Sequence, residues 1–204
     1  MPFAVAAVHL ERNATDGDVE VVFEVKGGDD GLTSLTILGP DGRTVAAFTA
    51  PDTATMGMRQ FRFESPEPTD GERMRAAYPE GAYAFAGVAA GGDRYAGTAT
   101  LSHRLPPTAT VLSPVDEAED VAIAGLVITW TPAADVMAYV VTVEQPELDF
   151  SLSVRLPGSA AAFVVPDGVL QPGREYQLAL GTVTAEGNAS FVETMFVTTG
   201  KERE

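Results

Sequence analysis

Hydrophobic and polar residues alternate over short runs through most of the first half of the chain. Alternation with a period of two places every second side chain on one face of a β-strand. The runs cover residues 3–10, 19–26, 32–38, 43–50, 58–64, 82–89 and 94–103. Clusters of Gly, Asp and Pro, which favour turns, separate them. Seven short strands with this spacing predict an antiparallel β-sandwich.

One segment of the first half departs from the strand pattern. Residues 70–78 contain Glu, Met, two Arg and two Ala, which favour a helical turn, and Pro79 ends it. The run 58–64 alternates imperfectly, because Met58 and Gln60 share a face with Arg62. We expect Phe61 and Phe63 to point into the core from the other face.

The composition changes at Pro106 and Pro107. Adjacent prolines cannot donate to a strand ladder and stiffen the backbone, which is typical of a short, semi-rigid linker. Beyond it, strands are predicted at residues 127–131, 138–144, 150–156, 161–165, 175–184 and 191–198. We therefore predict two domains, residues 1–105 with one short helical turn near 71–78, and residues 106–204.

Residues 107–199 carry a recognisable order of motifs. Trp130 lies in a β-branched run, Tyr139 follows nine residues later, and Leu170-Gln171-Pro172-Gly173-Arg174-Glu175-Tyr176 precedes an alternating strand. This order resembles a fibronectin type III domain, which belongs to the immunoglobulin-like folds. An indole fills the space between two sheets, and a corner tyrosine bonds its hydroxyl to nearby backbone. The predicted fold class is all-β, with two tandem antiparallel β-sandwich domains, the second fibronectin type III-like.

The end of the first half also carries a likeness. Residues 78–85 and 97–103, followed by the two prolines, are similar to the segment that precedes fibronectin-like domains in some exported bacterial proteins. That likeness implies a β-sandwich domain and a periplasmic, cell-surface or secreted location, and it implies no enzymatic activity. No Arg-Gly-Asp tripeptide is present, so integrin-type adhesion is unsupported.

The net charge of −16 narrows the choice of partners. Residues 1–105 hold 15 acids against 9 bases, and residues 106–204 hold 14 against 4, so the net charges are −6 and −10. A negative field repels phosphate backbones and anionic lipids, which argues against nucleic acid and membrane-surface binding. The first eight residues are apolar, but they resemble neither a signal peptide nor a membrane span. We expect no membrane insertion of this segment.

Candidate catalytic groups are few. The chain has no cysteine and two histidines, His9 and His103, which lie on the first and last predicted strands of the first half. We interpret both as surface histidines. Ser102 beside His103 is no catalytic dyad, because neighbours on a strand point to opposite faces. No glycine-rich phosphate loop is present. We therefore predict no catalytic residue, no enzyme and no cofactor.

Acidic and basic clusters each allow two interpretations. Asp16 and Asp18, Asp29 and Asp30, and the run 116–120 offer oxygen ligands of the kind that calcium takes, but none has EF-hand spacing. Solvated turn acids are the expected alternative, and we predict no metal site. Four arginines could form an anion site or could pair with surface carboxylates: Arg59, Arg62, Arg73 and Arg75. Asn13 and Asn188 begin glycosylation acceptor triplets.

Two functional hypotheses follow from these observations. The first is a non-catalytic binding or spacer module of a bacterial exported or cell-envelope protein that recognises a protein partner. The second is a carbohydrate-binding module or an accessory domain of a carbohydrate-active enzyme. Sugar platforms need exposed aromatic side chains, and Trp130 is expected in the core. Exposure of Tyr78, Tyr83 and Tyr95 separates the two hypotheses.

Overall fold

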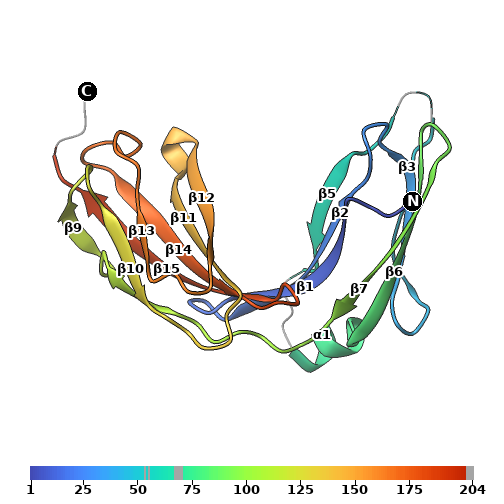
Figure 1. Ribbon diagram of the computed structural model, residues 1–204, viewed down its shortest axis with the longest axis horizontal. Helices are drawn as coiled ribbons and strands as arrows, with labels where there is room; N and C mark the ends of the chain where they lie inside the picture. The colour runs from blue at the N-terminus through green and yellow to red at the C-terminus, as the bar shows by residue number, and fades with distance from the viewer. Residues whose placement is uncertain (53, 55, 67–70, 201–204) are drawn as a thin grey trace. The chain divides into compact units, whose positions relative to one another are not determined.

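Strands dominate the protein. The computed structural model describes residues 1–52, 54, 56–66 and 71–200. These residues form two compact units (Figure 1). Unit 1 contains residues 1–11, 19–104 and 186–188, and unit 2 contains residues 12–18, 105–185 and 189–204. Among the described residues, no helix is both long and apolar enough to cross a bilayer.

Unit 1 contains two sheets and one short helix. Strands β1, β2 and β5 are neighbours in one sheet, and the other has the order β4-β3-β6-β7. The bounds are β1 (Val5–Asn13), β2 (Asp18–Lys26), β3 (Leu32–Leu38), β4 (Thr44–Thr49), β5 (Gln60–Glu64), α1 (Gly71–Ala77), β6 (Gly81–Ala89) and β7 (Arg94–Leu101). The predicted helical turn is α1, and Asp70, included in its predicted range, lies outside the described residues.

Aromatic side chains fill the space between the two sheets of unit 1. Phe23 on β2 stacks on Phe63 at a centroid distance of 5.1 Å and meets Tyr83 of β6 edge-on at 5.7 Å. Phe61 meets Phe48 of β4 at 6.2 Å. The prediction that Phe61 and Phe63 point inward is therefore confirmed.

Unit 2 pairs a three-stranded sheet with a four-stranded layer. The first has the order β13-β10-β8, the second the order β12-β11-β14-β15, and β9 pairs with β15 in parallel. The bounds are β8 (Thr110–Ser113), β9 (Ala118–Val121), β10 (Val127–Thr131), β11 (Ala138–Gln145), the 3₁₀ turn η1 (Pro146–Leu148), β12 (Phe150–Pro157), β13 (Ala162–Val164), β14 (Glu175–Val183) and β15 (Ala189–Thr198).

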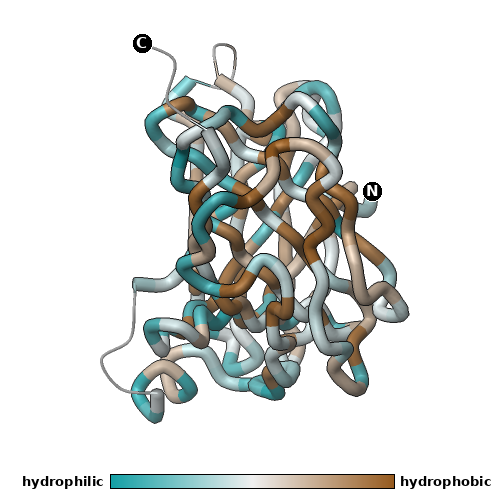
Figure 2. The backbone as a smooth tube through the Cα atoms, turned by 90° about the vertical axis from the view of Figure 1, so that its left-hand side faces the viewer, coloured by the Kyte–Doolittle hydropathy of each residue, from teal (hydrophilic) through white to brown (hydrophobic). Residues whose placement is uncertain are grey.

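The core of unit 2 is built around one indole. Trp130 is 2% exposed and packs on Tyr139 at a centroid distance of 5.2 Å. Tyr176 stacks on Phe196 at 5.6 Å, and its hydroxyl oxygen accepts the backbone N–H of Gln171 at 2.8 Å. Both features match the corner and core expected from the sequence. Hydrophobic and hydrophilic residues alternate along the backbone (Figure 2). The all-β, sandwich-like fold class is confirmed.

The structure differs from the sequence-based predictions in a few places. Strands β8 and β9 were not predicted, and β7 ends at Leu101, so His103 lies beyond the last strand of unit 1 instead of on it. The proline segment has no regular structure, but its backbone is bound. The Pro106 carbonyl accepts the hydroxyl of Ser190 at 2.9 Å, and the Pro107 carbonyl accepts that of Thr182 at 2.8 Å.

Candidate functional site

A groove lies on the outer face of the four-stranded layer of unit 2. Strand pairing sets Thr142, Ala179 and Glu193 side by side in one row, and Glu144, Gln177 and Met195 in the next. Residues that alternate with them along the strands, such as Val143 and Leu180, point into the core and are fully buried. The groove has a cavity of about 260 Å³. We call it the outer-face groove, lined by Thr15, Asp116, Thr142, Glu144, Gln177, Leu178, Ala179, Glu193, Thr194 and Met195.

Two loops form fixed walls beside these strands. The carboxylate of Asp116 accepts the backbone N–H of Met195 at 2.9 Å. The hydroxyl oxygen of Thr15, at the tip between β1 and β2, accepts the backbone N–H of Glu193 at 2.8 Å. Both walls are thus bonded to the backbone of β15.

The rim of the groove is negatively charged. Asp116, Glu144 and Glu193 line it, and in the described part of the chain no Lys, Arg or His lies within ion-pair distance of them. Glu144 accepts a hydrogen bond from the hydroxyl of Ser151 at 2.9 Å. The sequence marked Asp116 as one of an acidic run, but missed the two glutamates, because only the strand register brings them to one place.

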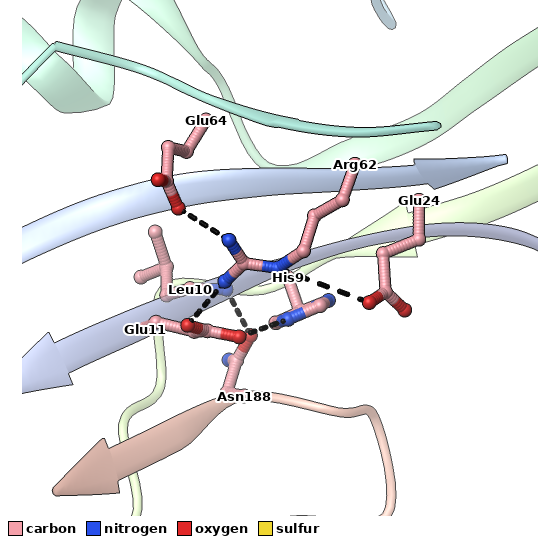
Figure 3. Close-up of polar contacts among 7 residues, drawn as sticks. All are labelled: His9, Leu10, Glu11, Glu24, Arg62, Glu64 and Asn188. Atoms are coloured by element: carbon pink, nitrogen blue, oxygen red, sulfur yellow. Dashed lines mark hydrogen bonds and ion pairs between the residues drawn. The ribbon is translucent and has the colours of Figure 1, made fainter. Parts of the chain in front are cut away.

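A second polar cluster occupies one face of unit 1. Arg62 on β5 donates to Glu11 of β1 at 2.6 Å and to Glu64 at 2.7 Å, and it lies 3.9 Å from Glu24 of β2 (Figure 3). Glu11 also contacts His9 Nε2 at 2.9 Å. Arg62 therefore pairs with surface carboxylates, which is one of the two alternatives that the sequence left open for the arginines.

In this cluster, charge pairing affects the pKa values of Glu11 and Arg62 more than burial does. Burial raises the pKa of Glu11, but the hydrogen bond from His9 and the charge of Arg62 together hold that pKa below its ordinary value. Burial likewise lowers the pKa of Arg62, and Glu11 and Glu64 reverse this and raise it. Both groups are thus held in their charged forms. Such a balance is typical of a structural ion-pair network.

The histidines are less exposed than predicted. The side chain of His9 is 11% exposed because it packs beside Glu11 and under the turn at Gly187, so the surface interpretation is wrong for it. His103 is half-buried, and its Nε2 contacts the carbonyl of Tyr78 at 2.8 Å. Ser102 instead accepts the backbone N–H of Arg104. Among the described contacts, neither histidine meets a serine or threonine hydroxyl, so no nucleophile–base pair is assembled.

The acidic loops are occupied by local hydrogen bonds. Asp16 accepts the side-chain amide of Asn13 at 2.9 Å and the backbone N–H of Asp18 at 3.1 Å. In the described ranges, no three His, Cys, Asp or Glu residues lie close enough together to hold a metal ion. Asp16 therefore acts as a turn acceptor.

No tyrosine or tryptophan forms an open platform. All five tyrosines and the tryptophan lie within the described residues, and none is exposed. Tyr83 is fully buried and its hydroxyl donates to the carbonyl of Pro79 at 3.0 Å. Burial, with the nearby charge of Asp41, raises the pKa of Tyr83 to about 12. Tyr78 and Tyr95 are half-buried and pack on Phe23 and Phe3.

Asn188 has a structural role. It is 1% exposed, and its amide oxygen accepts the backbone N–H of Leu10 at 2.8 Å. Its amide nitrogen donates to the carbonyls of Ser102 at 2.8 Å and Arg104 at 2.9 Å. A glycan needs that nitrogen free and accessible, so the acceptor triplet at Asn188 is not usable in the folded protein.

Comparisons with known proteins give the following matches. No family model and no curated protein matches the chain. It is similar to the fibronectin(III)-like modules of Clostridium thermocellum CbhA, with 13% identity, 98% of this chain and 96% of that chain covered, and a TM-score of 0.38. A two-domain fibronectin type III segment of chicken tenascin matches at 14% identity, with 97% and 100% covered and a TM-score of 0.36.

A third match is the BSP domain of a biofilm associated protein, at 15% identity, with 99% of this chain and 30% of that chain covered and a TM-score of 0.32. Such low TM-scores carry no argument about this chain. Its all-β, sandwich-like fold rests on the strands and cores described above.

Proposed function

We propose that this chain is a non-catalytic binding or spacer module of a bacterial exported or cell-envelope protein, and that it recognises a protein partner. In this proposal it consists of two tandem β-sandwich domains, residues 1–105 and 106–204, the second fibronectin type III-like. Its location is periplasmic, at the cell surface or secreted.

The observation that carries the proposal is the outer-face groove. It is open to solvent on a regular sheet face, its walls at Thr15 and Asp116 are bonded to β15, and three carboxylates rim it. A solvent-open surface of mixed polarity suits protein recognition. The polar side chains of the described lining are three threonine hydroxyls, the Gln177 amide and three carboxylates, and no histidine is among them to activate a hydroxyl.

The aromatic residues favour protein over carbohydrate recognition. Sugar rings stack on open aromatic faces, whereas Trp130 and Tyr83 are buried and Tyr78 and Tyr95 are half-buried against phenylalanines. The carbohydrate-binding alternative therefore lacks the platform that it requires.

A pull-down tests the proposal. The chain, immobilised through its C-terminus, is incubated with envelope extract from a bacterium that encodes it, and captured proteins are purified and titrated by calorimetry. We expect at least one protein that binds with a saturable 1:1 isotherm. Capture of soluble glycans, with no protein showing saturable binding, would contradict the proposal.

A further inference from the structure

The lining of the outer-face groove combines an apolar floor with an acidic rim. Ala179 and Thr142 contribute short side chains to the lining, and Met195, which is 41% exposed, contributes a long apolar one. Glu144 and Glu193 stand on β11 and β15, on either side of β14. A long side chain with an aliphatic stem and a charged head fits such a lining, because the stem contacts Ala179 and Met195 while the head reaches the carboxylates.

The negative charge of the rim indicates the charge of the partner that binds in the groove. The rim carboxylates have no cation of the described chain within ion-pair distance, and residues 106–204 carry a net charge of −10. An anionic ligand would be repelled by this field, whereas a cation relieves the mutual repulsion of Asp116, Glu144 and Glu193. The complementary partner is therefore basic.

A bound metal ion does not fit the same geometry. Glu144 and Glu193 lie on strands separated by β14, so their backbones are at least about 10 Å apart. In the described ranges no three His, Cys, Asp or Glu residues lie close enough together to hold a metal ion, whereas calcium takes about six to eight oxygen ligands. A lysine ammonium or an arginine guanidinium on a flexible stem can reach one carboxylate, and neighbouring basic side chains of one segment can reach both.

We propose that the outer-face groove of unit 2 binds lysine or arginine side chains of an extended basic segment. This inference rests on the proposed function, since it names the chemistry of the protein partner. Binding at this site is electrostatic at the rim and apolar at the floor, so it weakens as salt screens the carboxylates.

A labelled peptide probes the site directly. A fluorescein-labelled twelve-residue peptide of alternating Lys and Ser is titrated with the full chain at low salt, beside the same peptide carrying acetylated lysines. We expect saturable binding of the lysine peptide, at least tenfold weaker binding of the acetylated one, and amide chemical-shift changes centred on Thr142, Ala179 and Glu193. Equal binding of both peptides, shift changes centred elsewhere, or no binding would overturn the proposal.

Matched variants distinguish the effect of the rim carboxylates from the effect of the total charge of the chain. E144Q/E193Q removes two rim charges and keeps the carbonyl oxygen that accepts the Ser151 hydroxyl. E119Q/D29N removes two exposed charges outside the groove lining. We expect the first variant to weaken peptide binding at least tenfold and the second to change it less than twofold, with both melting like the native chain. Equal losses in the two variants would show that net charge alone attracts the peptide.

The pull-down distinguishes this inference from the proposed function. A captured partner that binds E144Q/E193Q at least tenfold more weakly than the native chain supports both. A partner that binds the two equally well refutes the basic-segment inference and leaves the binding function intact.

Discussion

At the scale of single residues, Trp130 has the largest predicted effect on stability. It is 2% exposed in the core of unit 2, and its indole N–H has no hydrogen-bond partner among the described atoms. Trp130→Ala should cost about 3–5 kcal/mol, because apolar contact is lost and a cavity remains. Trp130→Phe should cost less, because no hydrogen bond is removed. Urea unfolding followed by circular dichroism measures both, and an alanine cost below about 1 kcal/mol would show that Trp130 is not a core residue.

Asn188 should matter more than its place in a turn suggests. Asn188→Ala removes hydrogen bonds to Leu10, Ser102 and Arg104 and leaves their backbone groups without partners. We expect a loss of about 2–3 kcal/mol in the free energy of unfolding. Asn13→Ala is the control, since its contact with Asp16 is exposed and should contribute less than about 1 kcal/mol. Equal effects of the two variants would be inconsistent with the buried role of Asn188.

Glu11 should make stability depend on pH. Burial raises the pKa of Glu11, but His9 and Arg62 hold that pKa below its ordinary value. A group with a lowered folded-state pKa stabilises fully above its unfolded pKa, and this contribution is lost as the pH falls through the folded pKa. Unfolding free energy measured from about pH 5 to 3 should therefore fall more steeply in the native chain than in Glu11→Gln. Identical slopes would argue against the charged network of Figure 3.

Residues differ in how far the sequence predicts their roles. Trp130 and Tyr176 were predictable, because a lone indole and a corner tyrosine each follow from a local motif. The His9, Glu11 and Arg62 cluster was not, because its members come from β1 and β5 and meet only through sheet formation. For the same reason the sequence missed Glu144 and Glu193.

At the scale of elements, alternation located the long strands well. The predicted ranges 32–38 and 127–131 coincide with β3 and β10. Strands β8 and β9 were missed because each has four residues, and β9 carries acids where an alternating strand would carry hydrophobic residues. Their pairing depends on long-range partners in β10 and β15, which a local pattern does not contain.

The corner before β14 offers a test at this scale. Tyr176→Phe removes the hydroxyl that accepts the Gln171 N–H but keeps the ring stacked on Phe196. We expect a loss of about 0.5–1.5 kcal/mol in unfolding free energy, as for one hydrogen bond. Thermal or urea unfolding measures it. A cost as large as that of Trp130→Ala would mean that the ring, and not the hydroxyl, had been disturbed.

The acidic loops should need no metal. Asp16 accepts the local N–H of Asp18, and Asp116 that of Glu117. The melting temperature should therefore be the same in EDTA and in calcium. A midpoint that drops by several degrees in chelator and recovers with calcium would reveal a calcium site in one of these loops.

At the scale of the whole molecule, each compact unit contains segments that are not contiguous in the sequence. Residues 12–18 group with unit 2 and residues 186–188 with unit 1, although each lies far along the chain from the rest of its unit. No composition shift marks these segments, so the sequence indicated only the change at the prolines. Charge, in contrast, was readable from the sequence, and it directs the proposal toward a basic partner and away from nucleic acid.

The central claim is that this chain acts by binding and not by catalysis, and a turnover screen tests it most directly. The purified native chain is assayed against panels of glycoside, ester and peptide substrates, beside His9→Ala, Glu11→Gln and E144Q/E193Q. We predict that the native chain gives no product above a heat-denatured control. Turnover by the native chain that one of these variants abolishes, while its melting temperature stays unchanged, would contradict the account.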